Sequence, residues 1–158
     1  MLSAKEKAKI EQALYGMSSV LERTSPLNKN YSGDDLRILS SFAQTLYQNG
    51  DYEEAKGVYQ QLAAFEPYCP NYWEGVGACL QMEKRYEEAL KAWSMVSLLN
   101  EEDPLSHFHA AECYYALGLF LEGEKELDAC KARLKETNQD LHEKITRLES
   151  SWTKEEGA

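Results

Sequence analysis

The chain repeats itself with a period of 34 residues, and this feature constrains its fold more than any other. Three consecutive segments, residues 36–69, 70–103 and 104–137, align without a gap. Residues that match across the segments include the small set Ala55, Ala89 and Gly123 and the aromatic set Tyr52, Tyr86 and Phe120. A fixed period of this length indicates one supersecondary unit used three times, so the repeat takes precedence over any local motif.

Each unit is predicted to be a pair of antiparallel helices joined by a turn. Residues that favour helix dominate the composition, and no long alternating run of β-branched residues occurs. Turn signals are "QNGDY" at 48–52, "EKRY" at 83–86 and "LGLF" at 117–120. Pro67, Pro70 and Pro104 mark unit boundaries, because proline can begin a helix but cannot continue one. Since one pair cannot bury its own apolar face, the three pairs are expected to stack.

This pattern resembles the tetratricopeptide repeat, a helix–turn–helix unit of 34 residues. The second segment matches the family pattern of large and small residues with Trp73, Val76, Gly77, Leu80, Ala89 and Trp93. The first matches it with Leu39, Phe42, Ala43, Leu46, Ala55 and Tyr59. The third departs most, with His107 in the tryptophan slot and Gly123 in the alanine slot. The resemblance implies an all-α fold of three repeats stacked as a short right-handed superhelix.

Segments on either side of the repeats are predicted to be helical. Residues 1–35 hold an amphipathic helix and a polar linker, and the apolar stripe of that helix is Ile10, Ala13, Leu14, Met17, Val20 and Leu21. It either caps the repeats or joins two subunits as a homodimer. Residues 138–158 are predicted to be a capping helix and tail, with Leu141, Ile145, Leu148 and Trp152 on one face. The repeats themselves occupy residues 36–137.

Charge and composition narrow the class of protein. The formal net charge is −10, the wrong sign for a nucleic-acid-binding protein. No stretch is long and apolar enough for a signal peptide or a membrane span. The four cysteines show no C-x-x-C pair, so reduced thiols in the cytoplasm are expected.

One short stretch, "HFHAAEC" at 107–113, has the residue types of a zinc or catalytic site. His109, Glu112 and Cys113 are spaced to share one face of a helix. The repeat register, however, places His107 in the core slot of Leu39 and Trp73. We therefore expect no catalytic residue, no metal ligand and no cofactor, with a metal-dependent enzyme as a less favoured alternative.

In tetratricopeptide proteins the first helix of each pair lines a concave groove. The family's groove positions correspond here to Gln44, Tyr47, Ala78, Gln81, Phe108, Glu112 and Tyr115, with His109 beside them. We expect these eight residues to bind a peptide, with Tyr47, Phe108, His109 and Tyr115 as its anchors. Alternatively, some of the rings pack against the flanking helices. The family's groove positions also include Arg37 and Glu74. Arg37 is the one cation among all of them, beside Glu74 and Glu112, which argues against a heat-shock co-chaperone that binds acidic tails.

Three stretches are similar to a narrower family, the class II chaperones of bacterial type III secretion. They are "FAQTLYQNGDYEEAKGVYQQL" at 42–62, "VGACLQ" at 76–81 and "FHAAECYYALG" at 108–118. The resemblance implies a cytoplasmic, non-enzymatic chaperone whose groove binds an extended N-terminal segment of hydrophobic translocator proteins. Such binding prevents aggregation and premature association before export. The alternative is a generic tetratricopeptide scaffold in another bacterial complex.

Overall fold

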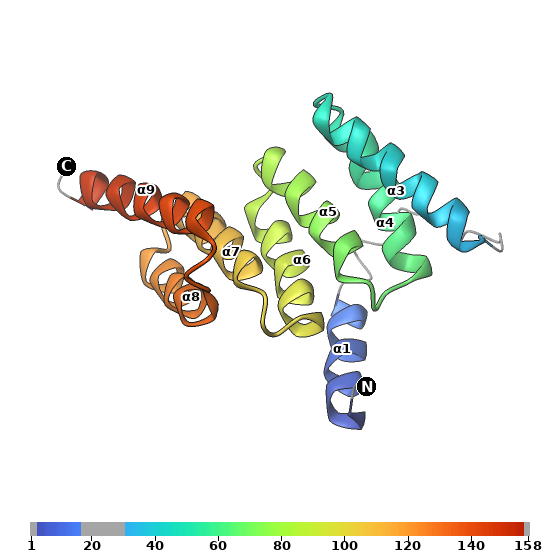
Figure 1. Cartoon of the computed structure of the whole chain (residues 1–158), viewed down its shortest axis with the longest axis horizontal. Helices are drawn as coiled ribbons and strands as arrows, with labels where there is room; N and C mark the ends of the chain where they lie inside the picture. Colours follow the sequence, from blue (N-terminus) through green and yellow to red (C-terminus); the bar gives the residue numbers. More distant parts are fainter. Residues whose placement is uncertain (1–2, 17–30, 157–158) are drawn as a thin grey trace. The chain divides into compact units, whose positions relative to one another are not determined.

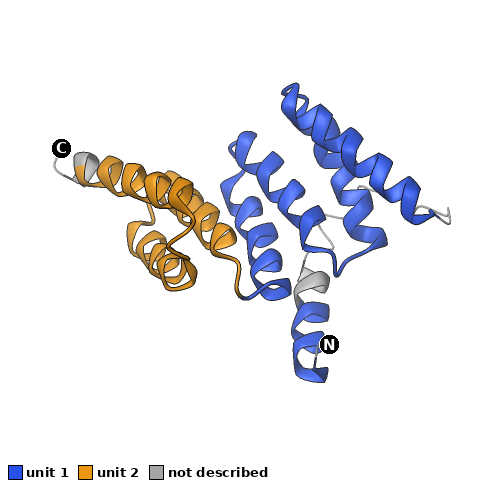
Figure 2. Ribbon diagram, viewed as in Figure 1, with its two compact units in different colours: residues 1–101 blue, residues 102–158 orange. Residues whose placement is uncertain are grey.

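A computed structural model of the chain describes residues 3–16 and 31–156, and all regular secondary structure within those ranges is α-helical (Figure 1). The chain divides into two compact units, residues 1–101 and residues 102–158 (Figure 2). The first unit contains α1 (Ala4–Gly16), α3 (Gly33–Gln48), α4 (Tyr52–Phe65), α5 (Pro70–Met82) and α6 (Tyr86–Leu99). The second contains α7 (Pro104–Ala116), α8 (Phe120–Arg133) and α9 (Gln139–Glu156). The predicted all-α fold of tetratricopeptide hairpins is confirmed.

The turns within the three hairpins share one backbone conformation. Gly50, Lys84 and Gly118 occupy the same position of each repeat, and all three have positive φ, at 88°, 61° and 74°. This left-handed conformation suits glycine and is strained for a residue with a Cβ atom. The turn signals read from the sequence therefore mark the actual ends of α3, α5 and α7.

Helix starts also follow local sequence rules. Ser32 and Asp35 form a capping box at the start of α3, in which each side chain accepts a hydrogen bond from the other residue's backbone N–H. Pro70 and Pro104 occupy the first turns of α5 and α7. The Asp103 carboxylate additionally accepts hydrogen bonds from two backbone N–H groups of α7. The capping box and the prolines fix where α3, α5 and α7 begin.

In the first unit the core is centred on α5 and α6. Trp73 is fully buried, and its indole Nε1 donates a hydrogen bond to the Pro67 carbonyl at 2.9 Å. Large rings lie against glycines of α5: a Cβ atom at Gly75 would come within 2.5 Å of the Tyr59 ring, and one at Gly77 within 2.9 Å of Trp93. The second repeat therefore packs by fitting rings into places where a side chain is missing.

A buried lysine links two helices of this unit. Lys56 on α4 is 5% exposed, and its Nζ lies 2.7 Å from Glu83 at the end of α5 and 2.9 Å from Glu53. A buried ammonium group is tolerated only when carboxylates compensate for its lost hydration. The repeat pattern gave no indication of this pair.

The amphipathic N-terminal helix packs within its own unit. Ile10 on α1 is 1% exposed, and α1 contacts α6. Of the other predicted stripe residues, the side chains of Ala13 and Leu14 and all of Met17, Val20 and Leu21 lie outside the described residues. Ile10 thus gives the helix a packing role within the chain.

Phe42 differs from what the repeat alignment suggests. It aligns with Val76 and Ala110, which are buried, yet Phe42 is 53% exposed. The physical reason is its place in the first hairpin: α3 contacts α4 and α5, whereas α5 contacts α3, α4 and α6. Ile38, one turn earlier, is exposed as well.

Two glycines provide a matched test of this packing. We expect Gly75→Ala to lower the free energy of unfolding by about 1–3 kcal/mol, because the new Cβ atom would overlap the Tyr59 ring. Gly123→Ala should be neutral or stabilising by up to about 1 kcal/mol, because its Cβ atom would make an ordinary 3.4 Å contact with Trp152 and alanine favours helix. Urea denaturation of both variants measures the difference, and equal losses would contradict the packing described.

The three hairpin turns allow a second test. Lys84→Gly should raise the free energy of unfolding by roughly 0.5–1 kcal/mol by relieving the left-handed strain, whereas Gly50→Ala should lower it by about 1 kcal/mol. Neither change alters packing, since a Cβ atom at Gly50 meets nothing within 4 Å and Lys84 is exposed. Opposite shifts in the urea midpoint are expected, and a loss of stability in Lys84→Gly would show that backbone strain does not dominate there.

Candidate peptide-binding site

The stretch that looked like an active site is held together by structural hydrogen bonds. The His107 Nδ1 atom on α7 lies 2.7 Å from Glu126 Oε2 on α8. The His109 Nδ1 atom lies 2.8 Å from Glu112 Oε2, one turn further along α7. The two histidines therefore have different carboxylate partners. Among residues 3–16 and 31–156, no three His, Cys, Asp or Glu side chains are grouped to hold a metal ion.

Burial makes the cysteines of the repeats poor nucleophiles. Desolvation raises the pKa of the Cys113 thiol to about 12, with a further contribution from the nearby Glu112 charge. Burial likewise raises the pKa of Cys79 to about 12 and that of Cys130 to about 11. Since the thiolate is the reactive form, these three side chains behave as small core residues.

A cavity of about 370 Å³ opens between α7 and α9 in the second unit. The α7 wall consists of Phe108, His109 and Glu112, which are three of the eight residues predicted to bind a peptide. The α9 wall consists of Lys144, Arg147, Leu148 and Ser151. The structure thus brings three predicted residues together and adds four that the sequence reasoning missed. Their spacing of i, i+3, i+4 and i+7 places them on one face of a helix, and this spacing could have indicated from the sequence that they share a surface.

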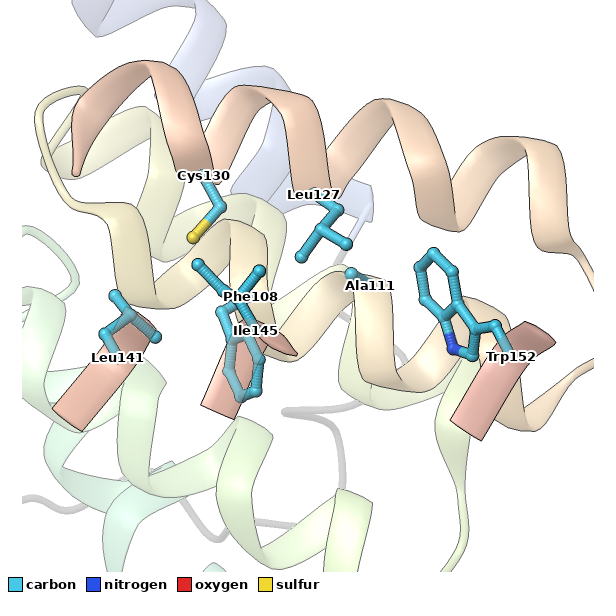
Figure 3. Close-up of a cluster of buried hydrophobic side chains, with 7 residues drawn as sticks. All are labelled: Phe108, Ala111, Leu127, Cys130, Leu141, Ile145 and Trp152. Carbon is cyan, nitrogen blue, oxygen red and sulfur yellow. The ribbon is translucent and has the colours of Figure 1, made fainter. Parts of the chain in front are cut away.

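Phe108 forms the base of this cavity and is also a core residue. It is 4% exposed and belongs to a cluster formed by Phe108, Ala111, Leu127, Cys130, Leu141, Ile145 and Trp152. Figure 3 shows these side chains meeting from α7, α8 and α9. Phe108 thus follows the alternative considered for the aromatic rings, namely packing against a flanking helix, because α9 covers a face of α7 that the repeat pattern leaves open.

Tyr115 packs against the last turns of α9. Its ring stacks on Trp152 with a centroid distance of 5.3 Å, and its hydroxyl donates a hydrogen bond to the Ser151 carbonyl at 3.2 Å. This is the alternative considered for the predicted aromatic anchors, namely packing against a flanking helix. Among the described residues, the buried Nε1 atom of Trp152 has no hydrogen-bond partner.

The other four predicted residues lie in the first unit. Gln44 is exposed on α3, and Ala78 is half-buried on α5. The half-buried Tyr47 ring meets the edge of Tyr52 at a centroid distance of 5.3 Å. The Gln81 Oε1 atom accepts a hydrogen bond from Trp93 Nε1 at 3.2 Å, so this side chain supports a core ring. Gln44 and Tyr47 share α3 with Arg37, whose guanidinium pairs with Asp34 at 3.1 Å.

Charges on α9 change the electrostatic expectation for the site. Arg37 was the one cation among the groove positions mapped on the first helices. Lys144 and Arg147 add two cations to the cavity between α7 and α9. The candidate site therefore contains more cations than the repeat positions alone predict.

Comparisons with known proteins agree with this architecture. A sequence model of the tetratricopeptide repeat matches residues 39–68 and 70–98. The Low calcium response locus protein H of Yersinia pestis is 36% identical over 111 residues, which cover 66% of this chain and 66% of that protein. The alignment thus spans just under two thirds of that relative's length.

Two solved structures are similar over a larger share of the chain. The Yersinia enterocolitica type III secretion translocator chaperone SycD is 33% identical, with 76% of this chain and 89% of that chain covered and a TM-score of 0.68. SycD in complex with a peptide of the translocator YopD is 28% identical, with 81% and 99% covered and a TM-score of 0.74. With its repeats and this degree of identity to SycD, the chain belongs to the family of tetratricopeptide-repeat translocator chaperones of bacterial type III secretion.

Proposed function

We propose that this protein is a cytoplasmic chaperone that binds an extended N-terminal segment of a hydrophobic translocator protein and shields it before export. One observation carries the proposal: Phe108, His109 and Glu112, predicted as peptide contacts from the repeat register, line a single cavity. A peptide of the translocator YopD is bound by the related chaperone SycD. The proposed client is of the same class.

The chemistry of the cavity suits a peptide side chain and its backbone. Its volume of about 370 Å³ lies within the range of sites that hold small ligands. Phe108 and Leu148 supply apolar surface, while Glu112 and Ser151 supply polar groups for the amides of an extended chain. Affinity in such a site comes from a few buried anchors, and the remaining contacts set the register.

A chaperone of this kind acts by binding its client and catalyses no reaction. While its client segment is bound, the concentration of free, aggregation-prone client falls by mass action. The raised pKa values of the buried thiols support a non-enzymatic protein. No helix among the described residues is long and apolar enough to cross a membrane.

Self-association is a second part of the proposal. A structure of SycD is described as an alternative dimer, and 27% of its residues are identical to those of this chain. We propose that this protein also forms a homodimer, through its N-terminal helix. Sedimentation at increasing concentration, with and without client peptide, tests this.

Tyr47 is the better residue for testing the site in the first unit, because the Tyr115 ring packs on Trp152. We expect Tyr47→Ala to weaken binding of the translocator segment by about 1–3 kcal/mol while the helical circular dichroism signal is retained. Tyr68→Ala is the matched control, since Tyr68 is exposed in the segment between α4 and α5. Isothermal titration calorimetry measures both affinities. Unchanged affinity in Tyr47→Ala would remove α3 from the site.

Thiol labelling tests the non-enzymatic part of the proposal. With pKa values of about 12, Cys79 and Cys113 would be roughly one part in 10⁴ thiolate at pH 8. We expect only the half-buried Cys69 to react quickly with a disulfide reagent in the folded protein, and all four cysteines to react in denaturant. Mass spectrometry of the labelled peptides identifies the sites. Fast labelling of Cys113 in the folded protein would contradict this expectation and support a nucleophilic role for Cys113.

A further inference from the structure

The cavity between α7 and α9 is positively charged on one wall, although the chain as a whole carries a net charge of −10. Lys144 and Arg147 both line it from α9, one turn apart. Leu148 lies between them and Ser151 on the same face. Two cations therefore line one wall of a cavity in a chain that is acidic overall.

Neither cation is held firmly by the pair that it makes within α9. Lys144 Nζ lies 2.8 Å from Asp140, and Arg147 lies 3.4 Å from Glu143, both one turn earlier on the helix. Lys144 is about half exposed and the other three side chains are largely exposed, and ion pairs of this kind are weak and screened by salt. A carboxylate that arrives in the cavity can therefore displace these partners at little cost in free energy.

On the α7 wall, the one acidic side chain is already engaged. The Glu112 carboxylate lies 2.8 Å from His109 Nδ1 on its own helix. The buried Phe108 ring and the half-buried Leu148 supply apolar surface to the cavity. The cavity thus combines an apolar base, a cationic wall and an acid that is hydrogen-bonded within α7.

We propose that this cavity is a client subsite that takes an aspartate or glutamate side chain, held by Lys144 and Arg147. The inference rests on the proposed function and names the chemistry of one position in the client segment. Because α9 is fixed to the core through Leu141, Ile145 and Trp152, the two cations sit on a rigid support. Charge recognition of this kind sets the register and selectivity of the segment more than its overall affinity.

A peptide scan tests the subsite. The probe is a fluorescent copy of the YopD peptide bound by SycD, with each position replaced in turn by Asp, Asn or Lys. For the wild-type protein we expect one position, or two neighbours, at which Asp binds roughly three- to tenfold more tightly than Asn, with Lys weaker than both. The Asp preference should shrink as salt is raised.

The decisive comparison uses two double variants of equal net charge. In Lys144→Gln with Arg147→Gln, the preference for Asp should fall below about twofold. In the control, Lys125→Gln with Lys135→Gln, it should persist, because these exposed lysines do not line the cavity. Circular dichroism melts check that both variants fold, as expected for changes at exposed side chains.

Outcomes separate the two proposals. If the unaltered peptide binds but no position prefers Asp, or the preference survives in Lys144→Gln with Arg147→Gln, the acidic subsite is wrong and the chaperone function stands. If the preference disappears equally in the control, net charge explains it and the subsite is again wrong. If the unaltered peptide fails to bind the wild-type protein, the proposed function fails and the subsite with it.

Discussion

Docking of α9 onto the third hairpin is the interaction on which the candidate site depends. A single helical hairpin leaves an apolar face open, and in the second unit Leu141, Ile145 and Trp152 cover it. The same contact brings Lys144, Arg147 and Leu148 opposite Phe108, His109 and Glu112. One packing event therefore buries the core of the unit and builds the second wall of the cavity, so stability and binding share residues here.

Much of the fold follows from the repeat, whereas the candidate site depends on α9, a helix that lies outside the repeats. The 34-residue register predicts the hairpins, the turns at Gly50, Lys84 and Gly118, and the buried ring of Trp73, because each depends on local geometry within one repeat. Phe108 is different. Its burial depends on a helix that lies outside the register, and its position in the repeat predicts a groove residue. Contacts between a repeat and a unique element leave no periodic trace in the sequence.

The "HFHAAEC" stretch illustrates how chemical residue types serve structure in a helical repeat. His107 fills a slot used by Leu39 and Trp73 in the other repeats, and its ring nitrogen meets Glu126 across the hairpin. This hydrogen bond satisfies the polar imidazole ring, which stands where the other repeats have a mainly apolar side chain. Cys113 is fully buried, and its raised pKa reflects that burial. The resemblance to a metal or catalytic site is therefore one of composition, and the side chains have separate partners.

Shared residues also imply that client binding and the docking of α9 are thermodynamically linked. A ligand that binds only when α9 is in place stabilises that arrangement by an amount set by its concentration and affinity. Conversely, anything that loosens Leu141 or Ile145 from Phe108 lowers the fraction of molecules with a complete cavity, and it lowers the apparent affinity by the same factor. Trp152, whose buried indole N–H has no partner among the described residues, sits at the end of this contact. Its ring stacks on Tyr115, so the linkage between client binding and α9 docking extends along the helix from Leu141 to Trp152.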